Sequence, residues 1–175
     1  VPVVPFDDPY VVCGQATIGL EMMSEQPELD TILVPLSGGG LLAGVALAAK
    51  LTKPGVRLVG VSIGRSPAML ESLKAGKPVA VEEKETLADS LLGGIGAENH
   101  YTLPLIDHYV DEHVVVDEPE IERAMFYAFR EHSLVIEGAA AVGIAALQTK
   151  KVRVSGERVG LVVSGSSVDL RQYTE

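Results

Sequence analysis

Residues 32–44 read Ile32-Leu33-Val34-Pro35-Leu36-Ser37-Gly38-Gly39-Gly40-Leu41-Leu42-Ala43-Gly44. The start of this stretch is apolar, as in a buried strand, and its end opens an apolar helix, so three consecutive glycines stand at the turn between them. Because glycine has no Cβ, the backbone N–H groups of such a turn can surround an anion at the positive end of the helix dipole. The stretch predicts a strand–turn–helix unit that binds a phosphorylated ligand, although a tight turn without a ligand also fits the glycines.

The composition predicts a single soluble domain in the cytoplasm. The chain has 175 residues, 47% of them hydrophobic, and a chain of this size can bury about 70% of its unfolded surface. The formal net charge of -10 argues against nucleic acid and membrane surfaces as partners, since both attract clustered Lys and Arg. Leu41–Ala49 is too short to cross a bilayer, and no secretory signal precedes it. The single Cys13 excludes an internal disulfide and is expected to be a small buried hydrophobe.

Helix and strand patterns alternate along the chain. We expect strands at Thr31–Leu36, Arg57–Ile63, His113–Val116 and Arg158–Val163. We expect helices at Gly14–Ser24, Leu41–Leu51, Ser66–Lys74, Asp117–His132 and Glu137–Thr149, with Ser66 and Asp117 as N-caps. This alternation predicts an α/β fold with a mostly parallel sheet, helices on both faces, and ligands at the carboxyl ends of the strands.

The glycine turn is also compatible with a dinucleotide site. The pattern Gly38-x-Gly40-x-x-Ala43 satisfies a dinucleotide fingerprint, and Arg65 follows the second expected strand, where it is placed to face a 2′-phosphate. However, no acidic residue ends that strand, as ribose recognition requires. A phosphate-ester or dinucleotide-binding module without catalytic activity therefore stays open as the alternative.

A second motif, residues 60–64, spells the nucleophile elbow of hydrolases around Ser62. That elbow needs its helix to begin at the serine, whereas the helix cap is expected later, at Ser66, which disfavours hydrolysis. The histidines share no metal-ligand spacing and are expected to be surface or structural residues: His100, His108, His113 and His132.

Six ordered blocks resemble, in order and spacing, the C-terminal two thirds of the threonine dehydratase and serine racemase family. The blocks are residues 5–9 (PFDDP), 14–21 (GQATIGLE), 37–44 (SGGGLLAG), 86–89 (TLAD), 137–141 (EGAAA) and 163–169 (VSGSSVD). These are pyridoxal-5′-phosphate enzymes of fold type II, the tryptophan synthase β-like fold. Residues 90–96 (SLLGGIG) also resemble the branch associated with ectoine or hydroxyectoine utilisation.

The resemblance implies a site and a reaction. Ser37 to Leu41 would bind the cofactor phosphate through backbone N–H groups, and Ser164 would meet the pyridine nitrogen, where a neutral hydroxyl favours β-elimination over transamination. The cofactor-binding residues implied are Ser37, Gly38, Gly39, Gly40, Leu41, Ser90, Glu137 and Ser164. The expected reaction converts a small β-hydroxy amino acid, such as serine or threonine, to a 2-oxo acid and ammonia.

Three departures from the family pattern carry further expectations. Ser62-Ile63-Gly64 stands where the family often has a metal-binding glutamate, so we expect no metal there. Ser90 replaces the usual glycine against the ring, which is expected to alter ring packing or substrate fit. Ser166-Ser167 replaces the common Gly-Asn pair beside Ser164.

The family's Schiff-base lysine and ring-gripping loop have no counterpart in the chain. Its lysines are expected at helix ends or in loops, where they are solvated: Lys50, Lys53, Lys74, Lys77, Lys84, Lys150 and Lys151. Together with a first residue, Val1, that is not methionine, this predicts that residues 1–175 form the C-terminal portion of the enzyme. We expect an N-terminal segment or chain to supply the lysine, the isolated chain to be inactive, and the intact protein to be a homo-oligomer, a dimer.

Overall fold

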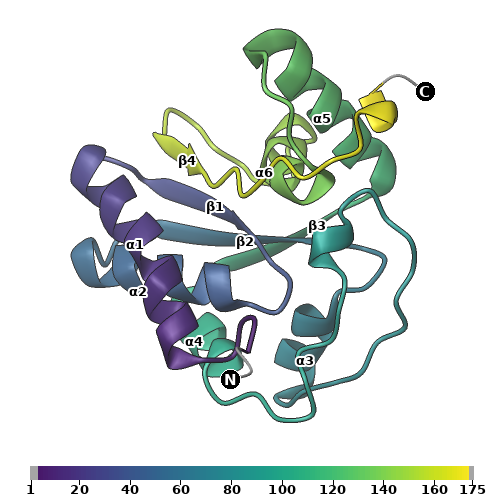
Figure 1. Cartoon of the computed structure of the whole chain (residues 1–175). Helices are drawn as coiled ribbons and strands as arrows, with labels where there is room; N and C mark the ends of the chain where they lie inside the picture. The colour runs from purple at the N-terminus through teal and green to yellow at the C-terminus, as the bar shows by residue number, and fades with distance from the viewer. Residues whose placement is uncertain (1–3, 174–175) are drawn as a thin grey trace.

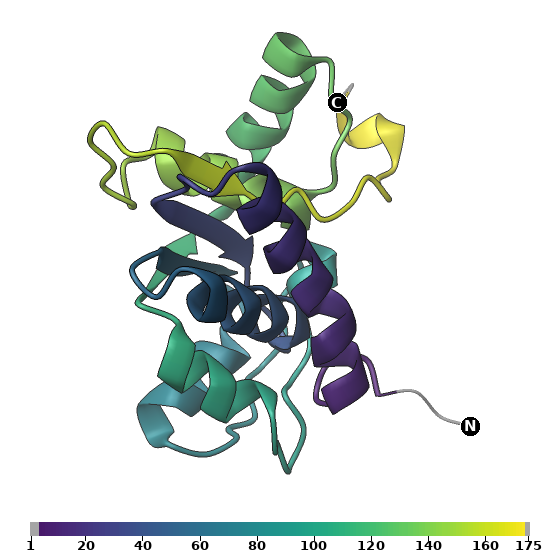
Figure 2. The ribbon, with the colours of Figure 1, turned by 90° about the vertical axis from the view of Figure 1, so that its left-hand side faces the viewer.

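The computed structural model describes residues 4–173 and shows a four-stranded parallel sheet with helices on both faces (Figures 1 and 2). The strands lie in the order β3-β2-β1-β4. Their bounds are β1 Thr31–Pro35, β2 Arg57–Ile63, β3 Glu112–Val116 and β4 Val159–Leu161. Every residue of β1 is buried, because this central strand has neighbours on both edges and helices on both faces. The predicted α/β fold with a parallel sheet is confirmed.

The first helical layer contains α1 (Pro9–Glu25), α2 (Gly40–Thr52), α3 (Ala68–Ala75) and α4 (Thr102–Tyr109). Helices α1 and α2 cross in backbone contact: a Cβ on Gly19 would lie 2.7 Å from the carbonyl oxygen of Val45, and one on Gly44 would lie 2.5 Å from that of Val12. This crossing holds the start of α2, and with it the glycine turn, against α1.

The second layer contains α5 (Glu118–His132) and α6 (Gly138–Gln148), which pack on the opposite face of the sheet. The predicted cap of α5 is confirmed: Asp117 Oδ1 accepts a hydrogen bond from the Glu120 backbone N–H, and the Glu120 carboxylate accepts one from the Asp117 N–H. Helix α6 is made largely of small residues and packs closely on the strands: a Cβ on its Gly143 would lie 3.0 Å from Leu161 Cδ2 of β4 and 3.8 Å from Leu33 Cβ of β1. Two short 3₁₀ helices, η1 (Asp89–Leu91) and η2 (Leu170–Tyr173), complete the elements.

Several expected boundaries were wrong. Helix α1 begins at Pro9 instead of Gly14, because the Asp8 carboxylate accepts hydrogen bonds from the backbone N–H groups of Tyr10 and Val11. Helix α3 begins after Pro67 and is not capped by Ser66, whose hydroxyl donates to the Glu82 carbonyl at 3.3 Å.

Helix α4 has a short apolar pattern and was not predicted. Cys13 is exposed on α1, so the expectation of a buried cysteine was wrong. No helix within residues 4–173 is long and apolar enough to cross a bilayer.

Candidate functional site

The glycine turn connects the end of β1 to the start of α2. Gly39 adopts a left-handed conformation with φ of 95°, in the N-cap position of α2, and no side chain caps this helix. The N–H groups of the first turn of α2 therefore have no side-chain cap to accept their hydrogen bonds, as an anion site requires. A Cβ on Gly39 would lie 2.6 Å from Ile106 Cδ1 and 2.7 Å from Met69 Cε, so a larger residue would have to displace both side chains as well as adopt a strained conformation.

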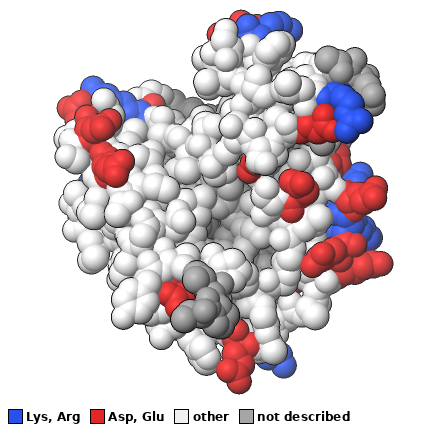
Figure 3. Space-filling model, viewed as in Figure 1, with Lys and Arg blue, Asp and Glu red and all other residues white. Residues whose placement is uncertain are grey.

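All of the residues predicted to bind a cofactor line one pocket beside the carboxyl end of β1. They are Ser37, Gly38, Gly39, Gly40, Leu41, Ser90, Glu137 and Ser164. The other lining residues were not predicted: Pro5, Phe6, Pro35, Leu91, Leu92, Gly93, Gly94 and Ala139. The pocket is hollowed into a face whose charged side chains lie mainly at its margin, as Figure 3 shows. Segments far apart in the sequence thus converge at the strand ends, where parallel sheets bind ligands.

Glu137 connects three walls of this pocket. Its carboxylate accepts hydrogen bonds from the Ser90 hydroxyl at 3.3 Å and from the Ser167 backbone N–H at 3.2 Å, while its own N–H donates to the Gly165 carbonyl at 3.2 Å. A Cβ on Gly165 would lie 3.0 Å from the Glu137 carboxyl group, so a side chain there would press on this carboxylate. Glu137 therefore holds the Ser90 loop and the segment that carries Ser164 against the start of α6.

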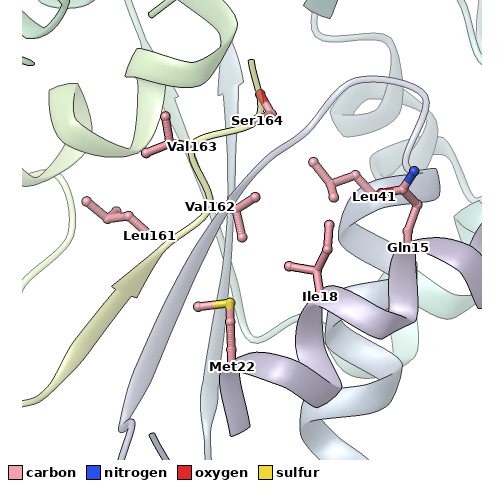
Figure 4. Close-up of a pocket in the computed structure, with 8 residues that line it drawn as sticks. All are labelled: Gln15, Ile18, Met22, Leu41, Leu161, Val162, Val163 and Ser164. Carbon is pink, nitrogen blue, oxygen red and sulfur yellow. The ribbon is translucent and has the colours of Figure 1, made fainter. Parts of the chain in front are cut away.

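An apolar groove runs beside β4 and meets the pocket at its end. Ile18 and Met22 of α1 lie on one side of the groove and residues 161–164 lie on the other, with the Val162 side chain pointing toward α1, as Figure 4 shows. The lining residues are Gln15, Ile18, Met22, Leu41, Leu161, Val162, Val163 and Ser164. Leu41 and Ser164 line both the groove and the pocket. Strand β4 pairs with β1 on one side only, so within the described residues its other edge is open.

No lysine of the described chain lines the pocket. Lys50 pairs with Asp111 at 2.8 Å and Lys151 pairs with Glu120 at 2.5 Å, both away from the glycine turn. The other lysine ion pairs are Lys53 with Asp30, Lys74 with Glu71 and Lys84 with Glu82. These side chains have the helix-end and loop positions that the sequence predicts.

The remaining candidates do not form a second site. Residues 4–173 hold no cluster of three or more His, Cys, Asp or Glu side chains that could bind a metal. Ser62 is buried within β2 and lies on no elbow. His113 Nε2 is buried without a hydrogen-bond partner. Burial lowers the pKa of His113, and the nearby Asp107 and Glu112 carboxylates oppose that shift. These features are typical of a neutral structural histidine.

Comparison with known proteins shows the family of the chain. The family model described as pyridoxal-phosphate dependent enzyme matches residues 1–165. The chain belongs to this family. The resemblance seen in the sequence is thus confirmed at family level, and the cofactor is pyridoxal phosphate rather than a dinucleotide. The assignment to the ectoine branch stays a prediction.

Relatives of the chain include a putative threonine dehydratase of Sinorhizobium fredii, 45% identical over 98% of this chain and 52% of that protein. An L-threonine ammonia-lyase of Thermotoga maritima is 42% identical over 95% of this chain and 41% of that protein. Maize serine racemase has a similar structure, with a TM-score of 0.89 and 34% identity over 98% of this chain and 53% of that one. The chain spans about half the length of the relatives it matches, and its sheet and helices have the fold of these enzymes.

Proposed function

We propose that this chain forms the phosphate-binding portion of a pyridoxal-phosphate-dependent ammonia-lyase of the threonine dehydratase type. The substrate is a small β-hydroxy amino acid. Loss of its α-proton and its β-hydroxyl removes one water, hydrolysis of the resulting enamine adds one back, and the products are a 2-oxo acid and ammonia. The observation that carries the proposal is the convergence of the implied cofactor-binding residues on one pocket, in a chain 45% identical to a protein described as a putative threonine dehydratase.

The residues of the pocket fit the cofactor by their chemistry. The uncapped glycine turn offers backbone N–H groups to a phosphate. The exposed Ser164 offers a neutral hydroxyl to the pyridine nitrogen, and Glu137 fixes the segment on which Ser164 lies. When bound, the cofactor supplies the electron sink that makes the α-proton acidic. The work of this chain is to anchor the phosphate, orient the ring and set the polarity at its nitrogen.

We further propose that the lysine that anchors the cofactor lies outside residues 1–175 and reaches the pocket when another segment docks in the groove beside β4. The groove supports this, because it ends at Leu41 and Ser164 of the pocket. Residues 159–164 contain no charge and no proline, the usual protection of an exposed strand edge. Val163 exposes 44% of its surface there. The unpaired edge and the apolar wall together fit an added strand.

Reconstitution tests this function. The chain is mixed with pyridoxal phosphate, alone and together with a polypeptide that covers the unmatched part of the Sinorhizobium fredii relative. We expect no 2-oxo acid from serine or threonine with the chain alone and formation of the 2-oxo acid in the mixture. Borohydride reduction and peptide mapping should place the cofactor on a lysine of the added polypeptide. A pyridoxyl adduct on one specific lysine of this chain would contradict the proposal, and cofactor binding without turnover in the mixture would favour a non-catalytic module.

A charge in the groove tests the docking surface. Val163→Lys places an ammonium group two residues past the end of β4, at an exposed residue that lines the groove. We expect the variant to fold but not to assemble with the added polypeptide in size-exclusion chromatography, whereas Val115→Lys, at a position 36% exposed on β3, serves as the matched control. Unchanged assembly of Val163→Lys would exclude this groove as the docking surface.

The predicted dimer of the intact enzyme is tested in the same chromatography runs by light scattering. The predicted cytoplasmic location is tested by cell fractionation.

A further inference from the structure

Asp7 lies outside the pocket and yet connects two of its supports. Its carboxylate accepts three backbone hydrogen bonds from the start of α4: from His100 at 2.7 Å, from Tyr101 at 2.9 Å and from Thr102 at 2.8 Å. A carboxylate at this position also interacts favourably with the helix dipole. Burial raises the pKa of Asp7, but the N–H groups of His100, Thr102 and Tyr101 outweigh it and hold the pKa below its ordinary value. The ionised carboxylate therefore holds the N-terminal segment to α4.

The residue before Asp7 forms one wall of the glycine turn. Phe6 lines the pocket, and its ring lies where a Cβ on Gly38 would be. Its backbone packs against the next part of the turn, because a Cβ on Gly40 would lie 3.0 Å from Phe6 Cα and from the Phe6 carbonyl oxygen. The position of Phe6 thus limits how the chain can run from Ser37 into α2.

Helix α4 lies on the other side of the glycine turn from Phe6. A Cβ on Gly39 would lie 2.6 Å from Ile106 Cδ1 and 3.0 Å from Thr102 Cβ, and both of these residues belong to α4. Thr102 is fully buried and is also one of the three residues that donate to Asp7. The glycine turn is therefore held between Phe6 on one side and α4 on the other, with Asp7 joining the two.

We propose that Asp7 is a positioning residue for the phosphate site: by tying Phe6 to α4 it fixes the conformation of residues 37–40 in which their N–H groups converge on phosphate. Asp7 does not contact the ligand in this arrangement, and its effect is transmitted through Phe6 and α4. This inference rests on the proposed function, because it assigns the cofactor phosphate to the glycine turn. Its consequence is selective: loss of the Asp7 carboxylate weakens recognition of the phosphate group and leaves contacts to the ring unchanged.

The neighbouring Asp8 provides a matched control. Its carboxylate also accepts backbone hydrogen bonds at a helix N-terminus, from Tyr10 at 2.8 Å and Val11 at 3.2 Å, but the helix is α1 and Asp8 does not line the pocket. Asp7→Ala and Asp8→Ala thus remove the same group from adjacent positions, and both lose helix-capping stability. Only Asp7→Ala releases the connection between Phe6 and α4.

The test measures binding of pyridoxine 5′-phosphate and of pyridoxine to the 175-residue chain. Neither probe has an aldehyde, so neither reacts with surface lysines. Titrations follow the amide resonances of Gly38, Gly39 and Gly40. We expect Asp7→Ala to raise the Kd for pyridoxine 5′-phosphate roughly tenfold, because the charged hydrogen bonds that tie Asp7 to the start of α4 are lost. The Kd of Asp7→Ala for pyridoxine should change less than about twofold. The Kd values of Asp8→Ala for both probes should also change less than about twofold.

The possible results separate the two proposals. If the wild-type chain binds both probes equally, the phosphate site itself is wrong and the proposed function fails with it. If the wild type prefers the phosphorylated probe and Asp7→Ala keeps that preference, only the role of Asp7 is wrong. Should Asp7→Ala not fold, Asp7→Asn keeps one acceptor oxygen, and Phe6→Ala removes the wall without altering Asp7. Both should lose selectivity for the phosphorylated probe, and an unchanged ratio of the two Kd values in both would overturn the inference.

Discussion

The hydroxyl of Ser90 donates to the Glu137 carboxylate at 3.3 Å, across a gap of 47 residues in the sequence. Ser90 is exposed in the pocket, at a position where the resemblance leads one to expect glycine against the cofactor ring. Under the proposed function, we expect this side chain to border the space that the substrate occupies. Glu137 keeps a second partner, the Ser167 N–H, so the loop does not depend on Ser90 alone.

Ser90→Gly is expected to broaden the substrate site. Removing the hydroxymethyl group opens room for the extra methyl group of threonine, so the ratio of kcat/KM for threonine to that for serine should rise roughly tenfold in the reconstituted enzyme. Ser90→Ala is the control, because it keeps Cβ and loses only the hydroxyl, with its hydrogen bonds to Glu137 and Asp89. An unchanged ratio in Ser90→Gly would show that Ser90 lies away from the substrate.

Gly39→Ala is expected to weaken both the fold and the phosphate site. The residue has φ of 95°, and a Cβ there would lie 2.6 Å from Ile106 Cδ1. The left-handed conformation alone costs about 1–2 kcal/mol for a residue with Cβ. Urea denaturation measures this loss. Gly14→Ala is the control: nothing lies within 4 Å of its Cβ position in helix α1, so it should be stabilising by about 0.5–1 kcal/mol. Equal effects of the two substitutions would contradict the assignment of strain to Gly39.

Substitutions at Ser164 test the partner of the ring nitrogen. Ser164→Ala should lower kcat in the reconstituted enzyme roughly tenfold while cofactor stays bound, because one hydrogen bond is lost. Ser164→Asp should protonate the ring nitrogen and divert part of the turnover to transamination, which is detected as pyridoxamine phosphate. Unchanged kinetics in both variants would place the nitrogen elsewhere.

His113 is expected to make the fold sensitive to mild acid. Burial lowers its pKa and Nε2 has no hydrogen-bond partner, so the folded state holds the neutral ring. Because the pKa is lower in the folded than in the unfolded state, protons bind the unfolded state more tightly, and stability falls as the pH drops below about 6.5. His113→Leu should reduce the slope of Tm against pH between about 7 and 5. Substitution of the exposed His132 by leucine is the control and should leave the slope of Tm against pH unchanged. If His113→Leu keeps the wild-type slope, other groups cause the acid sensitivity.

Local patterns in the sequence determined the elements that position the site. The apolar run of β1, the glycine turn and the capping box of α5 depend on residues that are neighbours in the chain, and each was found where it was predicted. The short helix α4 was missed, since its position is fixed by Asp7, which lies 93 residues away from His100 in the sequence. The start of α1 was placed too late because one cap, Asp8, went unrecognised.

The sequence by itself determined the α/β fold, the family and the kinds of residue in the site, because periodicity, turn chemistry and ordered motifs are properties of a linear chain. Only the tertiary structure decided which of these residues share a pocket, since Ser90, Glu137 and Ser164 meet through the crossing of separate segments at the strand ends. It also decided that Phe6 and α4 enclose the glycine turn and that, among residues 4–173, no strand covers the outer edge of β4. Contacts between distant segments follow from packing, which no local pattern encodes.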